Sequence, residues 1–254
     1  MKKSKHPSAN VTAKKSGMKS CGHLHVPRWK RVMDIICILC AFPIALPIML
    51  SIMAFIKIVS PGPVFFRQGR VGHRGKRFMC FKFRTMNVNA STTGHQNYLA
   101  HLMASNAPMI KMDAKGDSRL IPFGTLIRAT GLDELPQIFN VLNGEMSLVG
   151  PRPCLPYEHE SYRLRHKKRC DTLPGLTGLW QINGKNKTTF RRMIAMDLWY
   201  VKNKSFTIDM WIIARTIPAL LVQVIETQKV FRPKQGSPAH YKPASFVNQK
   251  SPSV

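Results

Sequence analysis

The feature that most constrains this chain is a run of 22 residues, 35–56, that contains no charged side chain. A helix rises about 1.5 Å per residue, so a helix over this run could cross a hydrocarbon core of about 30 Å. Pro43 and Pro47 lie inside the run, and each removes a backbone hydrogen-bond donor and favours a kink. Length therefore permits a membrane span, whereas the two prolines argue against a simple one.

Basic residues border the run on both sides, with Arg28, Lys30 and Arg31 before it and Lys57 after it. The positive-inside rule assigns both basic flanks to the cytoplasm. We therefore predict a re-entrant membrane helix-break-helix over residues 29–59, which enters and leaves the same face. An ordinary spanning helix is the alternative.

Charge is the second constraint, because 39 Lys and Arg against 12 Asp and Glu give a formal net charge of +27. Such an excess calls for an anionic partner, and nucleic acid, anionic lipid headgroups and phosphorylated substrates all qualify. Acidic residues are so scarce that the chain holds one adjacent acidic pair, Asp133-Glu134.

Composition divides the 254 residues into four parts. Residues 1–28 and 231–254 are polar, basic and predicted to be disordered tails. The main folded domain is predicted over 60–230, with a basic hairpin around 64–66 and 78–83, helices at 123–128, 132–142 and 158–170, and a short strand at 179–184. An amphipathic helix at 190–201 and an apolar, interfacial helix at 206–230 follow. The expected fold class is α/β.

The six cysteines show no disulfide framework, which fits a reducing compartment. A loose metal site at Cys21, His23 and His25 is a weak alternative to a polar tail.

Asp133-Glu134 lies between Gly131 and Pro136, which predicts the first turn of a helix. Acidic residues stabilise helix N-termini, so capping alone can explain the pair. In a basic, acid-poor chain the same pair also suits phosphoryl transfer, in which carboxylates hold Mg²⁺ or attack phosphorus. Both interpretations stay open on the residues alone.

Basic and amide side chains supply candidates for phosphate and nucleotide binding. Lys82 and Arg84 alternate along a predicted strand and so share one face. Arg152 lies between two prolines, which hold its backbone stiffly, and its planar guanidinium suits a phosphate, although an ordinary surface arginine in a turn is the alternative. Gln181 and Asn183 could hydrogen-bond a sugar or nucleotide, although a capped turn explains them equally well.

Taken in order, the motifs resemble the bacterial sugar transferase family, and within it the small monotopic phosphoglycosyl transferases. The resemblance covers about residues 29–225 and rests on the strings KRVMD (30–34), PGPVFFRQ (61–68), FKFRTM (81–86), LDELPQ (132–137), MSLVGPRP (146–153), PGLTG (174–178) and WQING (180–184).

The resemblance implies a compact cytoplasmic catalytic domain on the bacterial inner membrane, with both termini cytoplasmic and the helix break at Pro47. It implies transfer of a sugar 1-phosphate from a UDP-sugar to polyprenyl (undecaprenyl) phosphate, with release of UMP. Asp133 would be the nucleophile that forms an aspartyl phospho-sugar, and Glu134 would help to hold Mg²⁺. Such a reaction primes exopolysaccharide, capsule, O-antigen or glycoprotein glycan synthesis.

Two residues depart from the family's pattern: Leu46 precedes the break proline where a Ser is frequent, and Met33 stands where Phe is usual. Leu46 cannot cap freed backbone groups as Ser does, so Pro43 is a second candidate for the break. A membrane-tethered, basic nucleic-acid-binding module is the alternative function. The UDP-sugar, the glycan and a homodimer are not determined by the sequence.

Overall fold

The computed structural model describes residues 26–88, 102–103, 105, 107–109, 119–184 and 188–231. Nearly all of both predicted tails, the weak metal candidate at Cys21, His23 and His25, and most of the polar segment after residue 88 lie outside these ranges. The described part contains helices and two small sheets, so the expected mixture of helix and strand is confirmed.

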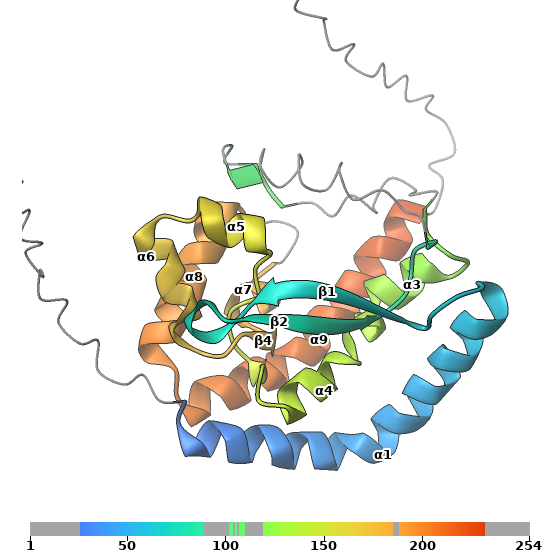
Figure 1. Cartoon of the computed structure of the whole chain (residues 1–254), viewed down its shortest axis with the longest axis horizontal. Coiled ribbons are helices and arrows are strands. Elements are labelled where there is room, and N and C mark those ends of the chain that lie inside the picture. The colour runs from blue at the N-terminus through green and yellow to red at the C-terminus, as the bar shows by residue number, and fades with distance from the viewer. Residues whose placement is uncertain are drawn as a thin grey trace, which may run out of the picture.

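Helix α1 spans Arg28–Val59 as one continuous helix of 32 residues with Pro43 and Pro47 inside it. It bends near its middle, first following the base of the molecule and then turning along its side (Figure 1). The two prolines lie within a bent, continuous helix and not at an interruption of it, and the re-entrant placement in a membrane stays a prediction. The Ser51 hydroxyl donates to the Pro47 carbonyl at 2.9 Å, a contact that accompanies helix bending.

One face of α1 packs on the rest of the protein. Ile38 and Ala45 join a core cluster with Val141 and Met146, and Met49 joins another cluster further along the helix. The opposite face exposes large apolar side chains: Val32, Ile36, Leu39, Phe42, Ile44, Leu46, Ile48 and Leu50. Within the described residues, α1 and residues 206–225 are each long and apolar enough to cross a membrane, by length and composition alone.

Strands β1 (Phe65–Val71) and β2 (Arg77–Phe83) form the predicted antiparallel hairpin, joined through the short helix η1 (His73–Gly75). Two shorter strands, β3 (Ser147–Val149) and β4 (Gly175–Thr177), pair in parallel. Gly150 and Gly175 approach so closely that a Cβ at Gly175 would collide with the Gly150 backbone nitrogen. Glycine is therefore required where these two segments meet.

The predicted helix at 123–128 is α3 (Gly124–Ala129), but the one at 132–142 divides into η3 (Leu132–Glu134) and α4 (Gln137–Leu142). Pro136 has no N–H to donate to the Leu132 carbonyl, so Leu135 donates to it instead at 3.2 Å and closes a tighter turn. The acidic pair thus lies in a 3₁₀ turn and not in the first turn of an α-helix.

The predicted helix at 158–170 is wrong as a single element, because the segment folds into α5 (Pro156–Ser161), α6 (Leu164–Lys167) and η4 (Lys168–Asp171). The backbone extends at Tyr162, whose side chain packs in a core cluster with Trp180 and Phe190. Burial of this aromatic ring accompanies the interruption.

The strand predicted at 179–184 is also wrong, because the segment forms a helical turn, α7 (Leu179–Ile182). Gln181 donates its backbone N–H to the Gly178 carbonyl at 3.0 Å, and Trp180 is buried in the core. The predicted helices at 190–201 and 206–230 are confirmed as α8 (Phe190–Asn203) and α9 (Phe206–Phe231).

Candidate active site

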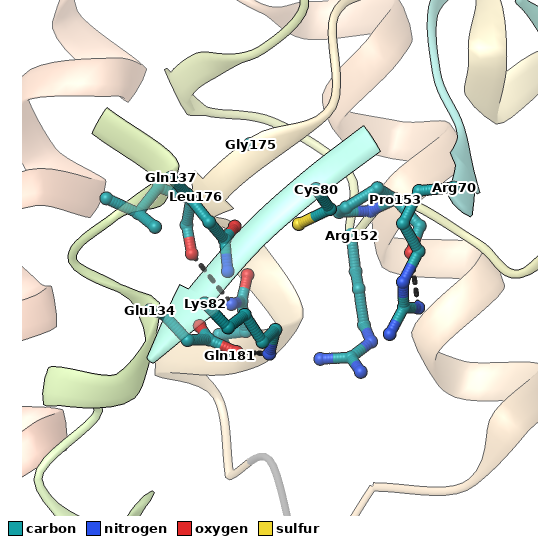
Figure 2. A pocket seen from close by; sticks show the side chains of 10 residues that line it. All are labelled: Arg70, Cys80, Lys82, Glu134, Gln137, Arg152, Pro153, Gly175, Leu176 and Gln181. Atoms are coloured by element: carbon teal, nitrogen blue, oxygen red, sulfur yellow. Dashed lines mark hydrogen bonds and ion pairs between the residues drawn. The ribbon is translucent and has the colours of Figure 1, made fainter. Parts of the chain in front are cut away.

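A pocket lies where the hairpin, the acidic turn, β4 and α7 meet, and it encloses about 260 Å³ of space open to solvent. Figure 2 shows its basic and amide side chains converging from different elements. The lining residues are Arg70, Cys80, Lys82, Glu134, Gln137, Arg152, Pro153, Gly175, Leu176 and Gln181. Four of the predicted site residues therefore share one pocket although they come from distant parts of the chain: Lys82, Glu134, Arg152 and Gln181.

The acidic pair faces a lysine from the hairpin. Lys82 Nζ lies 2.6 Å from Glu134 Oε1 and 4.0 Å from Asp133 Oδ2. Asp133 is buried, and Gly131 precedes the turn in the left-handed region with φ of 74°. A lysine close to two carboxylates offsets the repulsion between their negative charges.

Arg152 lines the pocket from a turn whose backbone is held at several points. Gly175 donates to the Pro151 carbonyl at 2.9 Å, and Arg169 Nη2 donates to the Arg152 carbonyl at 3.0 Å. Arg70 Nη1 donates to the next carbonyl, that of Pro153, at 3.0 Å. The turn presents the Arg152 side chain to the pocket, as its position between two prolines predicts.

Arg70, a buried residue whose guanidinium lies in the pocket wall, is not among the predicted site residues. Burial lowers the pKa of Arg70, and the nearby positive charge of Arg152 lowers it further. The hairpin register contains the signal that could have found it, because Phe66 pairs with Lys82 and Arg70 lies four residues further along the same strand, on the same face of the hairpin as Lys82. Burial also raises the pKa of the Cys80 thiol, which therefore stays protonated at neutral pH.

Two predicted site residues lie outside the pocket. Arg84 donates to the Pro61 and Ser60 carbonyls at 2.9 and 2.7 Å, just after α1. Strand β2 ends at Phe83, so the alternation that aligns Arg84 with Lys82 stops before it reaches Arg84. The predicted pairing of the two basic side chains in one anion site is therefore wrong.

The amide of Asn183 donates to the Leu179 carbonyl at 2.7 Å and does not line the pocket, which fits the capped-turn interpretation. Gln181 lines the pocket and donates to the Leu176 carbonyl at 3.1 Å. Its Oε1 is buried without a hydrogen-bond partner in the described structure, which leaves this acceptor available to a donor.

Asn140, also missed, joins the hairpin to α4. Its Oδ1 accepts from the Phe81 backbone N–H at 3.1 Å, and its Nδ2 donates to the Met79 carbonyl at 2.8 Å. This buried amide fixes the strand that carries Lys82 against the helix that follows the acidic pair.

A second buried network lies behind Arg152. Arg169 forms an ion pair with Asp197 of α8, and its Nη1 donates to the Tyr162 hydroxyl at 2.8 Å. Burial raises the pKa of Asp197 to about 6, against the opposing effect of Arg169, so the pair is charged at neutral pH.

No cluster of three metal-ligating His, Cys, Asp or Glu side chains occurs among the described residues. Asp133 and Glu134 nevertheless fit Mg²⁺, which is commonly held by one or two carboxylates together with substrate phosphates and water.

Comparison with known proteins gives the family directly. Residues 26–223 match the family model described as bacterial sugar transferase. The chain is 36% identical over 191 residues to the exopolysaccharide production protein ExoY of Sinorhizobium fredii, which covers 75% of this chain and 84% of that protein.

Longer proteins match as well. The undecaprenyl-phosphate galactose phosphotransferase of Salmonella typhimurium is 39% identical over 206 residues, covering 76% of this chain and 40% of that protein. The UDP-glucose:undecaprenyl-phosphate glucose-1-phosphate transferase of Xanthomonas campestris pv. campestris is 40% identical over 185 residues, covering 70% of this chain and 35% of that protein. The chain therefore belongs to the bacterial sugar transferase family and is an enzyme of the transferase class.

Proposed function

We propose that this chain transfers a sugar 1-phosphate from a UDP-sugar to polyprenyl phosphate and releases UMP. Family membership supports the proposal, as do relatives named for undecaprenyl-phosphate phosphotransferase and glucose-1-phosphate transferase activity. The nucleic-acid-binding alternative has no support in the matched family or in these relatives.

The observation that carries the proposal is the acidic turn beside a basic pocket. Asp133 lies within reach of Lys82, while Lys82, Arg70 and Arg152 line the pocket itself. A diphosphate placed there meets three cations that neutralise its charge, and a carboxylate at its edge that can act as nucleophile. Positioning and charge neutralisation are what phosphoryl transfer requires.

In the proposed first step, a carboxylate oxygen of Asp133 attacks the β-phosphorus of the UDP-sugar. The bond from that phosphorus to the bridging oxygen breaks, and UMP leaves with the electron pair. In the second step, an oxygen of polyprenyl phosphate attacks the same phosphorus and Asp133 leaves as a free carboxylate. The product is a polyprenyl diphospho-sugar, and atoms balance over the two steps.

Mg²⁺ is part of the proposal, held by Glu134 together with Asp133 and substrate phosphates. When bound, it would supply further charge neutralisation at the transferred phosphoryl group. Lys82 Nζ, 2.6 Å from Glu134, keeps this carboxylate oriented toward the pocket.

The acceptor is a membrane lipid, so we propose that the enzyme works at the cytoplasmic leaflet of the bacterial inner membrane. The exposed apolar face of α1 and exposed Trp211, Ile217 and Leu221 on α9 supply apolar surface for contact with lipid. Thiol labelling of cysteines introduced on both flanks of α1 tests this arrangement, because a flank accessible from the periplasm would contradict it.

The decisive experiment measures UMP release by purified protein supplied with a panel of UDP-sugars and polyprenyl phosphate. Asp133→Asn removes the nucleophile, so turnover and the phospho-sugar adduct seen by intact mass spectrometry should both be lost while the melting curve is unchanged. Glu160→Gln is the matched control, because Glu160 is an exposed acid that pairs with Arg77 on the surface. Unimpaired turnover by a folded Asp133→Asn protein would overturn the covalent route.

A further inference from the structure

Arg70 is a buried cation of the pocket wall that pairs with no acid among the described residues. It is 5% exposed, and its hydrogen bonds run to neutral acceptors, the Pro153 carbonyl at 3.0 Å and Gln68 Oε1 at 2.6 Å. Its Nε is buried without a hydrogen-bond partner in the described structure. The ion pairs among the described residues do not include Arg70.

Nearby acids are already engaged elsewhere. Glu134 binds Lys82, and Glu158 accepts the Leu155 backbone N–H at 2.8 Å. Arg152 adds a second positive charge close to Arg70, and its side chain makes no hydrogen bond or ion pair within the described ranges. Two adjacent guanidinium groups, one of them buried, are unfavourable unless an anion joins them.

The geometry points to an anion subsite formed by Arg70 and Arg152, which binds a phosphate monoester at the end of the pocket away from the acidic turn. Figure 2 shows the two guanidinium groups next to each other at one end of the pocket, and Lys82 and Glu134 at the other. Guanidinium forks match the oxygen pairs of phosphate, and two of them suit a dianion.

The subsite rests on the proposed function, and it gives the two half-reactions a common requirement. In-line displacement places the leaving group opposite the attacking carboxylate of Asp133. The acceptor must later attack opposite that same carboxylate, so it enters where UMP left. UMP and polyprenyl phosphate are both phosphate monoesters, and one pair of arginines can therefore bind each in turn.

The test compares binding of UMP and uridine to wild type and to Arg70→Gln. Loss of a charged hydrogen-bond donor should weaken UMP binding by about 10- to 100-fold and leave uridine binding unchanged. Arg70→Lys, which keeps the charge, should recover part of the loss. Arg67→Gln is the matched control, because Arg67 is exposed on the same strand and its guanidinium lies over the Phe81 ring.

Equal weakening of UMP and uridine would show that Arg70 merely holds the Pro153 carbonyl, and unchanged UMP binding would show that it binds no phosphate. Either result overturns the inference.

A second arm identifies the source of the phosphate. Discharge of the preformed phospho-sugar adduct by decaprenyl phosphate isolates the second half-reaction from the nucleotide. A raised KM for the lipid in Arg70→Gln, together with weakened UMP binding, supports a shared subsite. Weakened UMP binding with an unchanged lipid KM supports an anion subsite for the nucleotide alone. It overturns the inference that UMP and the lipid phosphate use the same subsite.

Methyl phosphate separates this inference from the proposed function, because it contains neither nucleotide nor lipid. If wild type releases no UMP from any UDP-sugar, the proposed function fails, yet methyl phosphate should still bind wild type more tightly than Arg70→Gln. Equal binding of methyl phosphate to both proteins would overturn the subsite independently of the reaction.

Discussion

Two of the places where the described structure buries positive charge differ in kind: the junction of α1 with α8 and α9, and the basic end of the pocket. At the junction, Lys30 is fully buried, and its Nζ lies 2.5 Å from Asp209 Oδ2 and 2.9 Å from the Tyr200 hydroxyl. At the pocket, Arg70 and Arg152 are paired with no acid among the described side chains. Lys30 thus joins elements through a buried ion pair, whereas Arg70 and Arg152 line the pocket without an acid partner.

The junction is also where the membrane-helix candidate meets the catalytic domain. Asp34, one turn after Lys30, accepts from Ser147 Oγ and from the Leu148 backbone N–H, both at 3.0 Å. Tyr200 donates to Asp209 Oδ1 at 2.6 Å. These charges and hydrogen bonds orient α1 on β3. The residues that form them do not line the pocket.

The largest expected effect comes from breaking the neutralised pair. Lys30→Met leaves Asp209 buried without its cation, and it should lower the free energy of unfolding by about 3–5 kcal/mol. Thermal melts of the detergent-solubilised protein measure the loss. Lys30→Met/Asp209→Leu should recover most of it. An unchanged melt combined with lost UMP binding would instead assign Lys30 to the site.

Lys82→Met tests the opposite case, a cation at the pocket. Lys82 is partly exposed and contacts both acids, so the substitution should leave the melting temperature nearly unchanged and lower kcat by about 100-fold. Steady-state UMP release measures the effect, with the exposed hairpin residue Lys76→Met as control. A large drop in melting temperature with normal kcat in the folded fraction would make Lys82 structural.

Asn140→Ala tests whether a buried neutral amide contributes as much to stability as the buried ion pair at the junction. The change leaves the Phe81 N–H and Met79 carbonyl without their partner, so it should cost about 1–3 kcal/mol of stability. Denaturant titration measures the cost. Asn140→Asp keeps the acceptor for the Phe81 N–H but brings a buried carboxylate against Glu145 and the Met79 carbonyl, so it should recover little stability. Equal stability of all three proteins would contradict the anchoring role.

Acidification should produce a smaller loss of stability. Burial and the neighbouring Arg74 lower the pKa of His73, so below pH 6.5 the unfolded chain binds protons at this site more readily than the folded one. Stability contributed by neutral His73 is present above pH 6.5 and is lost as the pH falls below it. Melts between pH 7 and 5 should show a shallower decline in His73→Gln, and identical slopes would remove His73 as the cause.

The smallest effect is expected at an exposed ion pair. Arg77 and Glu160 lie 3.3 Å apart with side chains about two-thirds exposed or more, so Arg77→Ala should change stability by less than about 1 kcal/mol. A loss of stability as large as that of Lys30→Met would show that burial does not decide how much an ion pair of this protein contributes to stability.

Much of the site could be predicted because it depends on local patterns. The hairpin follows from its apolar runs around glycines, and Arg152 reaches the pocket from a turn bordered by prolines. The predicted placement of Arg84 beside Lys82 is wrong, because strand alternation holds only to the end of the strand. No residue pattern marks Phe83 as that end.

Arg70, Asn140 and Asp197 could not be predicted because their roles depend on partners far along the chain. Arg70 contacts the Pro153 carbonyl 83 residues away, and Asn140 contacts β2 about 60 residues away. Asp197 is a charged residue of an amphipathic helix, where solvent exposure is the ordinary expectation, yet it is buried against Arg169. Residues of this kind look like ordinary surface charges until tertiary packing places them.

The contact between Gly150 and Gly175 has a consequence for substrate choice. Backbone meets backbone there, and Gly175 forms part of the pocket lining, so this wall can neither gain a side chain nor retreat by losing one. Changes in the shape of this pocket must therefore come from its other walls. In this chain the adjustable walls are Leu176, Gln181 and Gln137, and exchanges at these three positions are where altered sugar preference should be sought.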